Sequence, residues 1–69
     1  MRGFVRLWDS DRAFGFIRSD EGGFDTFLHI SQVQRSGLNG IAEGDRLEFE
    51  VGTNPHNGRP MAVNLRMLG

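Results

Sequence analysis

The sequence lacks cysteine and lysine, has only two prolines among its 69 residues, and contains no long apolar run. The absence of cysteine excludes disulfide bonds and thiolate metal sites, and nothing in the chain requires an oxidising compartment. No run approaches the length needed to span a bilayer, and the start of the chain lacks the apolar segment of a signal peptide. We therefore expect a cytoplasmic protein that does not enter a membrane.

A strong excess of basic residues is also missing, because eight arginines stand against nine acidic residues for a net charge of −1. Many nucleic-acid-binding proteins have a basic excess, so we expect attraction by bulk charge to be weak. The charges are unevenly placed, since Arg6, Arg12 and Arg18 fall in the first third of the chain and acidic residues gather at 43–50. Guanidinium groups can stack on bases and pair with phosphates. A compositional bias of the source genome explains equally well why every basic residue is arginine and none is lysine.

No window of ten or more residues keeps the 3.6-residue apolar period of a helix, and the alternation that is present has period two. Ten glycines and a hydrophobic content of 38% also suit a small, turn-rich β domain. Ser31 is placed to cap one helical turn that extends through Gln34, and no longer helix is expected. Five strands are predicted, at residues 3–9, 13–19, 24–30, 45–52 and 60–68.

Five short antiparallel strands in a single domain of residues 1–69 leave unprotected edges unless the sheet closes. We therefore predict an all-β fold, a five-stranded antiparallel OB-type barrel, with the connection at residues 31–44 lying across it. The alternation assigns ten apolar side chains to the core of this barrel: Val5, Leu7, Ile17, Leu28, Val33, Leu47, Phe49, Val51, Val63 and Leu65.

Two aromatic segments, at residues 12–17 and 26–30, carry the main functional signal. Alternate side chains of a strand share a face, so Phe14 and Phe16 point together, as do Phe27 and His29. The residues between them are small or apolar and can take the core side, which leaves the rings facing water. Exposed rings on a pleated surface suit a platform on which unpaired nucleobases stack.

Simple alternation also turns Trp8 outward beside Arg6, which would widen the platform. The opposite placement stays open, because a lone tryptophan in a small domain is commonly a core anchor with one polar edge. Phe4 and Phe24 are assigned structural or peripheral roles.

The sequence offers little for catalysis or metal binding. His29 and His56 are the only histidines, and their spacing forms no metal-ligand pattern. Asp9 and Asp11 fall in a turn, where such side chains usually accept hydrogen bonds from backbone amides. We therefore predict that the protein is not an enzyme and needs no cofactor or metal, that His29 is a stacking ring, and that His56 has no specific role.

These residues resemble the cold-shock domain family of small nucleic-acid-binding OB barrels, and the resemblance covers essentially the whole chain. The segment RAFGFI at residues 12–17 is similar to the family's first ribonucleoprotein motif, and TFLHI at residues 26–30 is similar to its second. Residues 3–6, 43–49 and 58–65 resemble its first, fourth and last strands. The RNA-recognition motif has the shorter of its two motifs first and is a longer domain, so the order of the motifs here and the short chain exclude that fold.

The resemblance implies binding of single-stranded RNA or DNA, with a preference for pyrimidine-rich strands, and action as an RNA chaperone or a regulator of transcription or translation. Arg6 and Arg12 stand where the family has lysines that touch the backbone or base edges. A monomer is expected, although strand exchange between two copies stays open. The residues predicted to bind nucleic acid are Arg6, Trp8, Arg12, Phe14, Phe16, Phe27, His29 and Arg59.

Several positions depart from the pattern of the family. Leu7 replaces a surface tryptophan, Ile30 and Leu38 replace aromatic residues, and Ala13 replaces a glycine. We expect the fold to tolerate Ala13 if its backbone stays in the β region.

Two aromatic stacking positions of the family are missing at Ile30 and Leu38, and each stacked base contributes about 1 to 3 kcal/mol to binding. We therefore expect micromolar or weaker binding of nucleic acid unless Phe24, Arg35 or Arg59 compensates. The alternative function is a protein-interaction module on the same barrel, in which nucleic-acid binding is weak or lost. The near-neutral charge and the missing aromatic residues support that alternative.

Overall fold

The structure is a computed structural model that describes residues 1–68, and these residues form five strands and one short helix. Each predicted strand is present, and its ends lie within one residue of the predicted ones. In chain order the elements are β1 (Arg2–Asp9), β2 (Phe14–Ser19), β3 (Asp25–His29), α1 (Ile30–Arg35), β4 (Arg46–Thr53) and β5 (Pro60–Met67).

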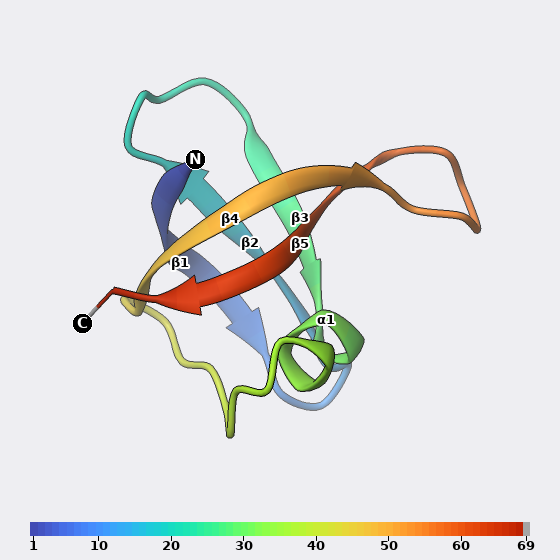
Figure 1. Cartoon of the computed structure of the whole chain (residues 1–69), viewed down its shortest axis with the longest axis horizontal. Helices are drawn as coiled ribbons and strands as arrows, with labels where there is room; N and C mark the ends of the chain where they lie inside the picture. Colours follow the sequence, from blue (N-terminus) through green and yellow to red (C-terminus); the bar gives the residue numbers. More distant parts are fainter. Residues whose placement is uncertain (69) are drawn as a thin grey trace.

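The strands form a closed barrel in the order β1-β2-β3-β5-β4, with β4 pairing back onto β1. In Figure 1, β4 and β5 lie in front of the sheet made by β1, β2 and β3. Neighbouring strands are antiparallel except β3 and β5, which meet in parallel at Phe27 and Met61. The predicted all-β barrel of the OB type is confirmed, with this one parallel pair.

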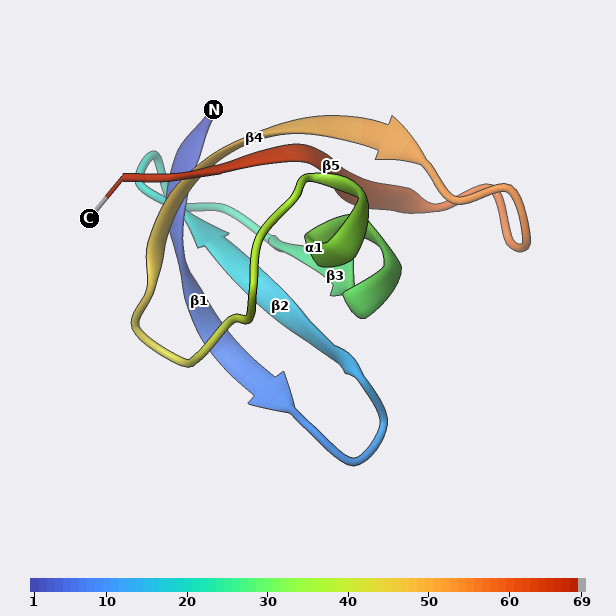
Figure 2. The ribbon, with the colours of Figure 1, turned by 60° about the horizontal axis from the view of Figure 1, so that its bottom comes forward.

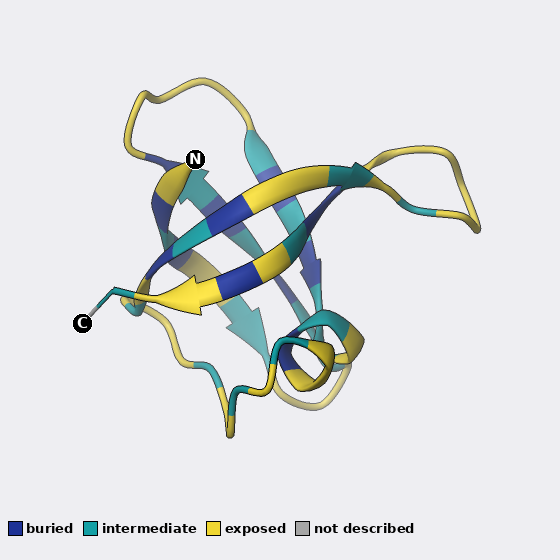
Figure 3. Cartoon of the chain, in the orientation of Figure 1, coloured by how far each residue is buried: buried dark blue, intermediate teal, exposed yellow. Residues whose placement is uncertain are grey.

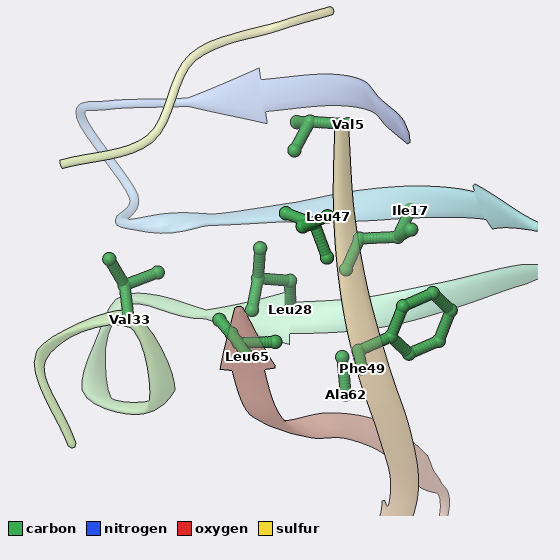
Figure 4. Close-up of a cluster of buried hydrophobic side chains, with 8 residues drawn as sticks. All are labelled: Val5, Ile17, Leu28, Val33, Leu47, Phe49, Ala62 and Leu65. Atoms are coloured by element: carbon green, nitrogen blue, oxygen red, sulfur yellow. The ribbon is translucent and has the colours of Figure 1, made fainter. Parts of the chain in front are cut away.

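The core fills the barrel with side chains from all five strands and from the helix (Figure 4). Period-two alternation predicted most of them correctly, since the inward side chains of β1, β2 and β3 are almost fully buried. Burial of this apolar surface, at about 25 cal/mol for each Å², is the main stabilisation available to so small a chain. The cluster comprises Val5, Ile17, Leu28, Val33, Leu47, Phe49, Ala62 and Leu65.

Three of the predicted core residues lie elsewhere. Leu7 and Val51 are exposed, at 39% and 48%, and Val63 is only half-buried. The register of β1 against β2 shifts between Val5 and Leu7, and that of β4 against β5 shifts between Glu48 and Glu50. A bulge adds one residue to one strand, so the side chains beyond it change face. Strict alternation along β1 and β4 is therefore wrong after these two points.

The helix α1 follows β3 directly, and the connection after it runs along the barrel to the start of β4 (Figure 2). Its N-cap is His29 rather than the predicted Ser31, because His29 Nδ1 accepts a hydrogen bond of 3.1 Å from the Ser31 backbone N–H. Leu38 and Ile41 of the connection pack against the core cluster. The expectation that this segment lies across the barrel is confirmed.

Ala13 precedes β2 and has a φ of +61°. This value lies in the left-handed region, where an L-residue with a Cβ atom is strained. The condition under which we expect the fold to tolerate Ala13 without strain, a backbone in the β region, is therefore not met. The strained peptide is held by tertiary structure, because the Ala13 carbonyl accepts a 2.9 Å hydrogen bond from the Ile30 N–H at the start of α1.

The β2–β3 and β4–β5 connections are largely exposed and extend beyond the barrel (Figure 3). Within residues 1–68, no helix has the length and apolar character needed to cross a membrane.

Candidate nucleic-acid interface

The outer face of β1, β2 and β3 carries three rows of side chains, because residues directly opposite each other in an antiparallel pair share a face. The first row joins Asp9, Phe14 and His29, and the second joins Leu7, Phe16 and Phe27. The third joins Phe4, Arg18 and Asp25. Two rows of rings therefore lie beside one row with an ion pair.

The four predicted stacking rings, Phe14, Phe16, Phe27 and His29, form one connected cluster, which we call the ring face. The centroids of Phe14 and Phe27 are 5.7 Å apart, and each lies 6.0 Å from the centroid of Phe16. His29 extends the cluster, with its ring 6.4 Å from Phe27 and tilted by 32°. All four side chains are half-buried, so each keeps part of its ring open to solvent.

Trp8 does not lie on the ring face, and the prediction that it points outward beside Arg6 is wrong. The bulge at Arg6 pairs Leu7 with Phe16 and Trp8 with Gly15, which is buried. Trp8 packs against the core cluster, as the core-anchor alternative predicts. A Cβ atom at Gly15 would lie only 2.8 Å from Trp8 Cε3 and 2.1 Å from the Leu7 carbonyl oxygen, so the indole needs a glycine there.

Leu7 takes the place on the ring face that alternation assigned to Trp8. Its side chain is 39% exposed beside Phe16 and offers an aliphatic rather than an aromatic surface. Ile30 and Leu38, the other two positions where aromatic residues are missing, are half-buried against the core. Of these three residues, strand pairing therefore places only Leu7 beside a ring.

Two arginines share one carboxylate at the edge of the ring face. Arg6 Nε and Arg18 Nε each lie 2.6 Å from a different oxygen of Asp25, whose side chain is 17% exposed. The hydrogen bond from Arg18, with a further one from Arg6, holds the pKa of Asp25 below its ordinary value, although partial burial opposes this. Arg6, a predicted phosphate contact, is thus already paired with a charge of opposite sign.

The remaining predicted arginines are less restrained. The Arg12 side chain is 77% exposed and comes no closer than 4.0 Å to the Asp9 carboxylate. Arg59 is exposed on the β4–β5 connection, where its backbone N–H donates to Asn57 Oδ1. Arg35 lies exposed in the last turn of α1. Ion pairs at such exposure contribute little to stability, so Arg12 can exchange its partner for a phosphate at low cost.

His29 is oriented by the start of the helix. Its Nδ1 accepts the Ser31 N–H and lies 3.0 Å from Ser31 Oγ, so the neutral ring carries its proton on Nε2. The capping interaction holds the ring in place beside Phe27.

Two pockets adjoin the ring face and share Phe27 and Asn54 as lining residues. The first, of about 290 Å³, lies between Phe16 and Phe27 of the sheet and the β4–β5 connection. The second, of about 650 Å³, lies between α1 and β4–β5 and is lined by His29, Arg35 and His56 among others. The two pockets therefore adjoin each other at Phe27 and Asn54, beside the rings.

Sequence reasoning missed the residues that this connection brings to the rings. His56 was expected to have no specific role, yet it lines the same pocket as His29. Asn54 and Asn57 were treated only as turn residues, and both line the first pocket. One signal was available for Asp25, because pairing Phe16 with Phe27 in a β2–β3 hairpin sets Arg18 opposite Asp25.

The structure offers no clustered metal ligands within residues 1–68, where groups of three or more His, Asp or Glu side chains suited to a metal ion are absent. The polar groups beside the ring face are those of arginines and asparagines, the His29 ring that caps α1, and the ion-paired Asp25 carboxylate. This set can bind phosphates and base edges.

Comparison with known proteins agrees with this geometry. The sequence model of the family described as the 'Cold-shock' DNA-binding domain matches residues 1–68. The cold shock-like protein CspE of Escherichia coli K12 is 40% identical over 68 residues, which cover 99% of this chain and 96% of that protein. The cold shock protein CspA of Rhizobium meliloti is 36% identical over 64 residues, covering 93% of each chain.

A plant protein contains a similar segment within a longer chain. The glycine-rich protein 2 of Nicotiana sylvestris is 39% identical over 64 residues, which cover 93% of this chain and 29% of that protein. The barrel topology, the two aromatic motifs at their expected places and the match over residues 1–68 together show that the chain belongs to the cold-shock domain family, a nucleic-acid-binding and not an enzymatic family.

Proposed function

We propose that this protein binds single-stranded RNA or DNA by stacking unpaired bases on the ring face, and that it acts as an RNA chaperone of modest affinity. The connected cluster of four half-exposed rings carries this proposal. Bases present flat π faces whatever their sequence, so such a cluster binds unpaired strands with little discrimination. A duplex keeps its bases stacked inside and offers no face to the rings.

Arginines supply the contacts to the phosphate backbone. Arg12 and Arg59 are exposed on two different connections, β1–β2 and β4–β5. Arg6 can contribute only by leaving or sharing the Asp25 carboxylate. With two or three phosphates neutralised, the salt dependence of binding should be shallow, with a slope of about −0.7 for each contact.

Titration of a short fluorescein-labelled oligothymidylate, followed by anisotropy, tests the proposal. The unmodified protein should bind the single strand with micromolar affinity and leave a labelled duplex unbound. Replacing both Phe16 and Phe27 with alanine removes two platforms, so affinity should fall by about 30-fold or more.

Val51→Ala is the matched control, because Val51 is an exposed apolar strand residue that lines neither pocket. It should bind as the unmodified protein does. Circular dichroism of each variant separates loss of binding from loss of fold. An unmodified protein that gives no anisotropy change at high micromolar concentration contradicts the proposal.

The chaperone activity follows from mass action. A protein that binds only the open form of a hairpin shifts the equilibrium toward that form once its concentration exceeds the dissociation constant. A weak RNA hairpin with a fluorophore and a quencher at its ends should therefore open as protein is added. Fluorescence that stays constant while the single strand binds would limit the protein to binding without melting.

The alternative function, a protein-interaction module, is favoured by one observation. Asp25 neutralises two of the arginines nearest the rings, which weakens attraction of a polyanion. This function predicts that binding of oligonucleotides is weak or lost, so an anisotropy change that is absent at high micromolar protein would favour it over the first proposal.

A further inference from the structure

We infer that the Asn39–Gly40 peptide is a site of spontaneous deamidation in the folded protein, and that the other Asn–Gly pair of the chain, Asn57–Gly58, is protected from the same reaction. Both pairs lie in exposed connections, the first between α1 and β4 and the second between β4 and β5. The inference concerns a covalent modification of the chain, so it does not depend on the proposed binding of nucleic acid.

The reaction needs only groups of the chain and water. The Gly40 backbone nitrogen loses its proton and attacks Asn39 Cγ, the new N–C bond closes a five-membered imide, and the Cγ–Nδ2 bond breaks to release ammonia. Water then opens the imide at either carbonyl, which leaves aspartate or isoaspartate at position 39 and a further negative charge on the chain. Glycine favours the attack, because without a Cβ atom it readily adopts the backbone conformation that the ring closure requires.

Asn39 and Gly40 are unrestrained in the structure. Both residues are exposed, and within residues 1–68 neither the Asn39 side chain nor the Gly40 N–H takes part in a hydrogen bond. Apart from its chain neighbours, no described atom lies within 4 Å of the place where a Cβ atom on Gly40 would lie. The Asn39 amide can therefore turn toward the Gly40 nitrogen without breaking an interaction.

The connection is fixed on either side of this pair. Leu38 and Ile41 pack against the core cluster, and the Leu38 N–H donates a 3.1 Å hydrogen bond to the Val33 carbonyl. Asn39 and Gly40 therefore form a short exposed bridge between two anchored residues. Ring closure within this bridge does not require the barrel to unfold.

Two hydrogen bonds oppose the same attack at Asn57. The Gly58 N–H donates to the Asn54 carbonyl at 2.7 Å, so the nitrogen that would attack is occupied. Asn57 Oδ1 accepts the Arg59 N–H at 2.9 Å, which holds the side chain in a turn. Freeing the nitrogen and turning the amide costs these bonds, so we expect Asn57 to convert at about one-tenth of the rate of Asn39 or less.

The other two of the four asparagines are protected by the residue that follows each of them. Asn54 precedes Pro55, which has no N–H to lose. Asn64 precedes Leu65, whose N–H donates to Ser36 Oγ at 2.9 Å. Neither is expected to deamidate while the protein is folded.

Peptide mapping by mass spectrometry, after incubation of the protein in mildly alkaline buffer, tests the inference. In the folded protein Asn39 should convert and Asn57 should stay largely intact. In protein unfolded by guanidinium chloride both Asn–Gly pairs should convert at similar rates, because the hydrogen bonds that protect Asn57 are lost. A methyltransferase specific for isoaspartate, supplied with labelled S-adenosylmethionine, should label the incubated protein.

Two variants serve as controls. Gly40→Ala should slow the conversion of Asn39 and leave the thermal stability nearly unchanged, because the added Cβ atom meets open space and Gly40 has no positive φ. Asn39→Gln cannot close the five-membered ring, so its labelling should fall to the level of freshly prepared protein.

Three outcomes would overturn the inference. They are an Asn39 that converts only in the unfolded protein, an Asn57 that converts as fast as Asn39 in the folded protein, and labelling that persists in Asn39→Gln. None of them bears on the binding of oligothymidylate, so this inference and the proposed function can fail separately.

Discussion

Ala13→Gly should stabilise the protein, because Ala13 has a φ of +61° in the region that glycine enters without strain. A left-handed conformation costs an L-residue about 1 to 2 kcal/mol. Glycine also has more conformational freedom than alanine in the unfolded chain, and this lowers the free energy of unfolding by about 0.4 to 1 kcal/mol. The expected net gain in the free energy of unfolding therefore lies between about 0 and 1.6 kcal/mol, with a central value of about 0.8 kcal/mol.

The gain should be visible as a shift of the melting temperature. An entropy of unfolding of about 2.1 cal/mol/K for each residue implies that a gain of about 0.8 kcal/mol raises the melting temperature by about 5 °C for a chain of this size. Differential scanning calorimetry measures this shift, and urea denaturation should show a higher midpoint with an unchanged slope.

Two control variants test whether the gain in stability comes from backbone strain at Ala13. Ala42→Gly places the same change at an exposed residue without a positive φ, so it should lower stability by about 0.4 to 1 kcal/mol. Asn64→Gly should bring little or no gain, since asparagine tolerates its φ of +52° and Asn64 Nδ2 donates to Glu50 Oε1. A melting temperature that Ala13→Gly lowers as far as Ala42→Gly does would refute the assignment of strain to Ala13.

Three further predictions concern the ring face. Leu7→Trp adds a ring beside Phe16 and should raise affinity for oligothymidylate by about 5- to 150-fold in the anisotropy titration, whereas Val51→Trp should not. Asp25→Asn releases Arg6 and Arg18, so binding should tighten and its salt slope should steepen by up to about 0.7 for each new phosphate contact. The lowered pKa of Asp25 stabilises the fold above the unfolded value of about 3.9, and this contribution is lost as the pH falls through the folded pKa. Chemical denaturation between pH 6 and 3 should therefore show a smaller loss of stability in Asp25→Asn.

The strand segments and the barrel were predictable because their signals are local. Period-two alternation and turn residues depend on neighbours in the chain, and they placed every strand to within one residue. The pairing of Phe14 with His29 and of Phe16 with Phe27 also follows from one hairpin. The common face of the four rings therefore follows from the sequence of these two strands.

The places of Leu7 and Trp8 were not predictable from alternation. A bulge at Arg6 depends on how β1 fits between β2 and β4, and no residue type in β1 indicates a bulge at this position. The left-handed backbone of Ala13 was not predictable from alternation either, because alternation says which face a side chain takes and does not specify φ at the residue before a strand.

By itself, therefore, the sequence determined the class of fold, the segments that become strands and the four rings on one face. Tertiary structure alone decided which side chains border those rings. It packed Trp8 against the core cluster, brought Arg6 to the Asp25 carboxylate that Arg18 faces within the β2–β3 hairpin, and brought the β4–β5 connection alongside Phe24. The physical reason is that alternation and turn chemistry act between neighbours in the chain, whereas bulges, shared ion pairs and pocket walls require segments far apart in sequence to meet.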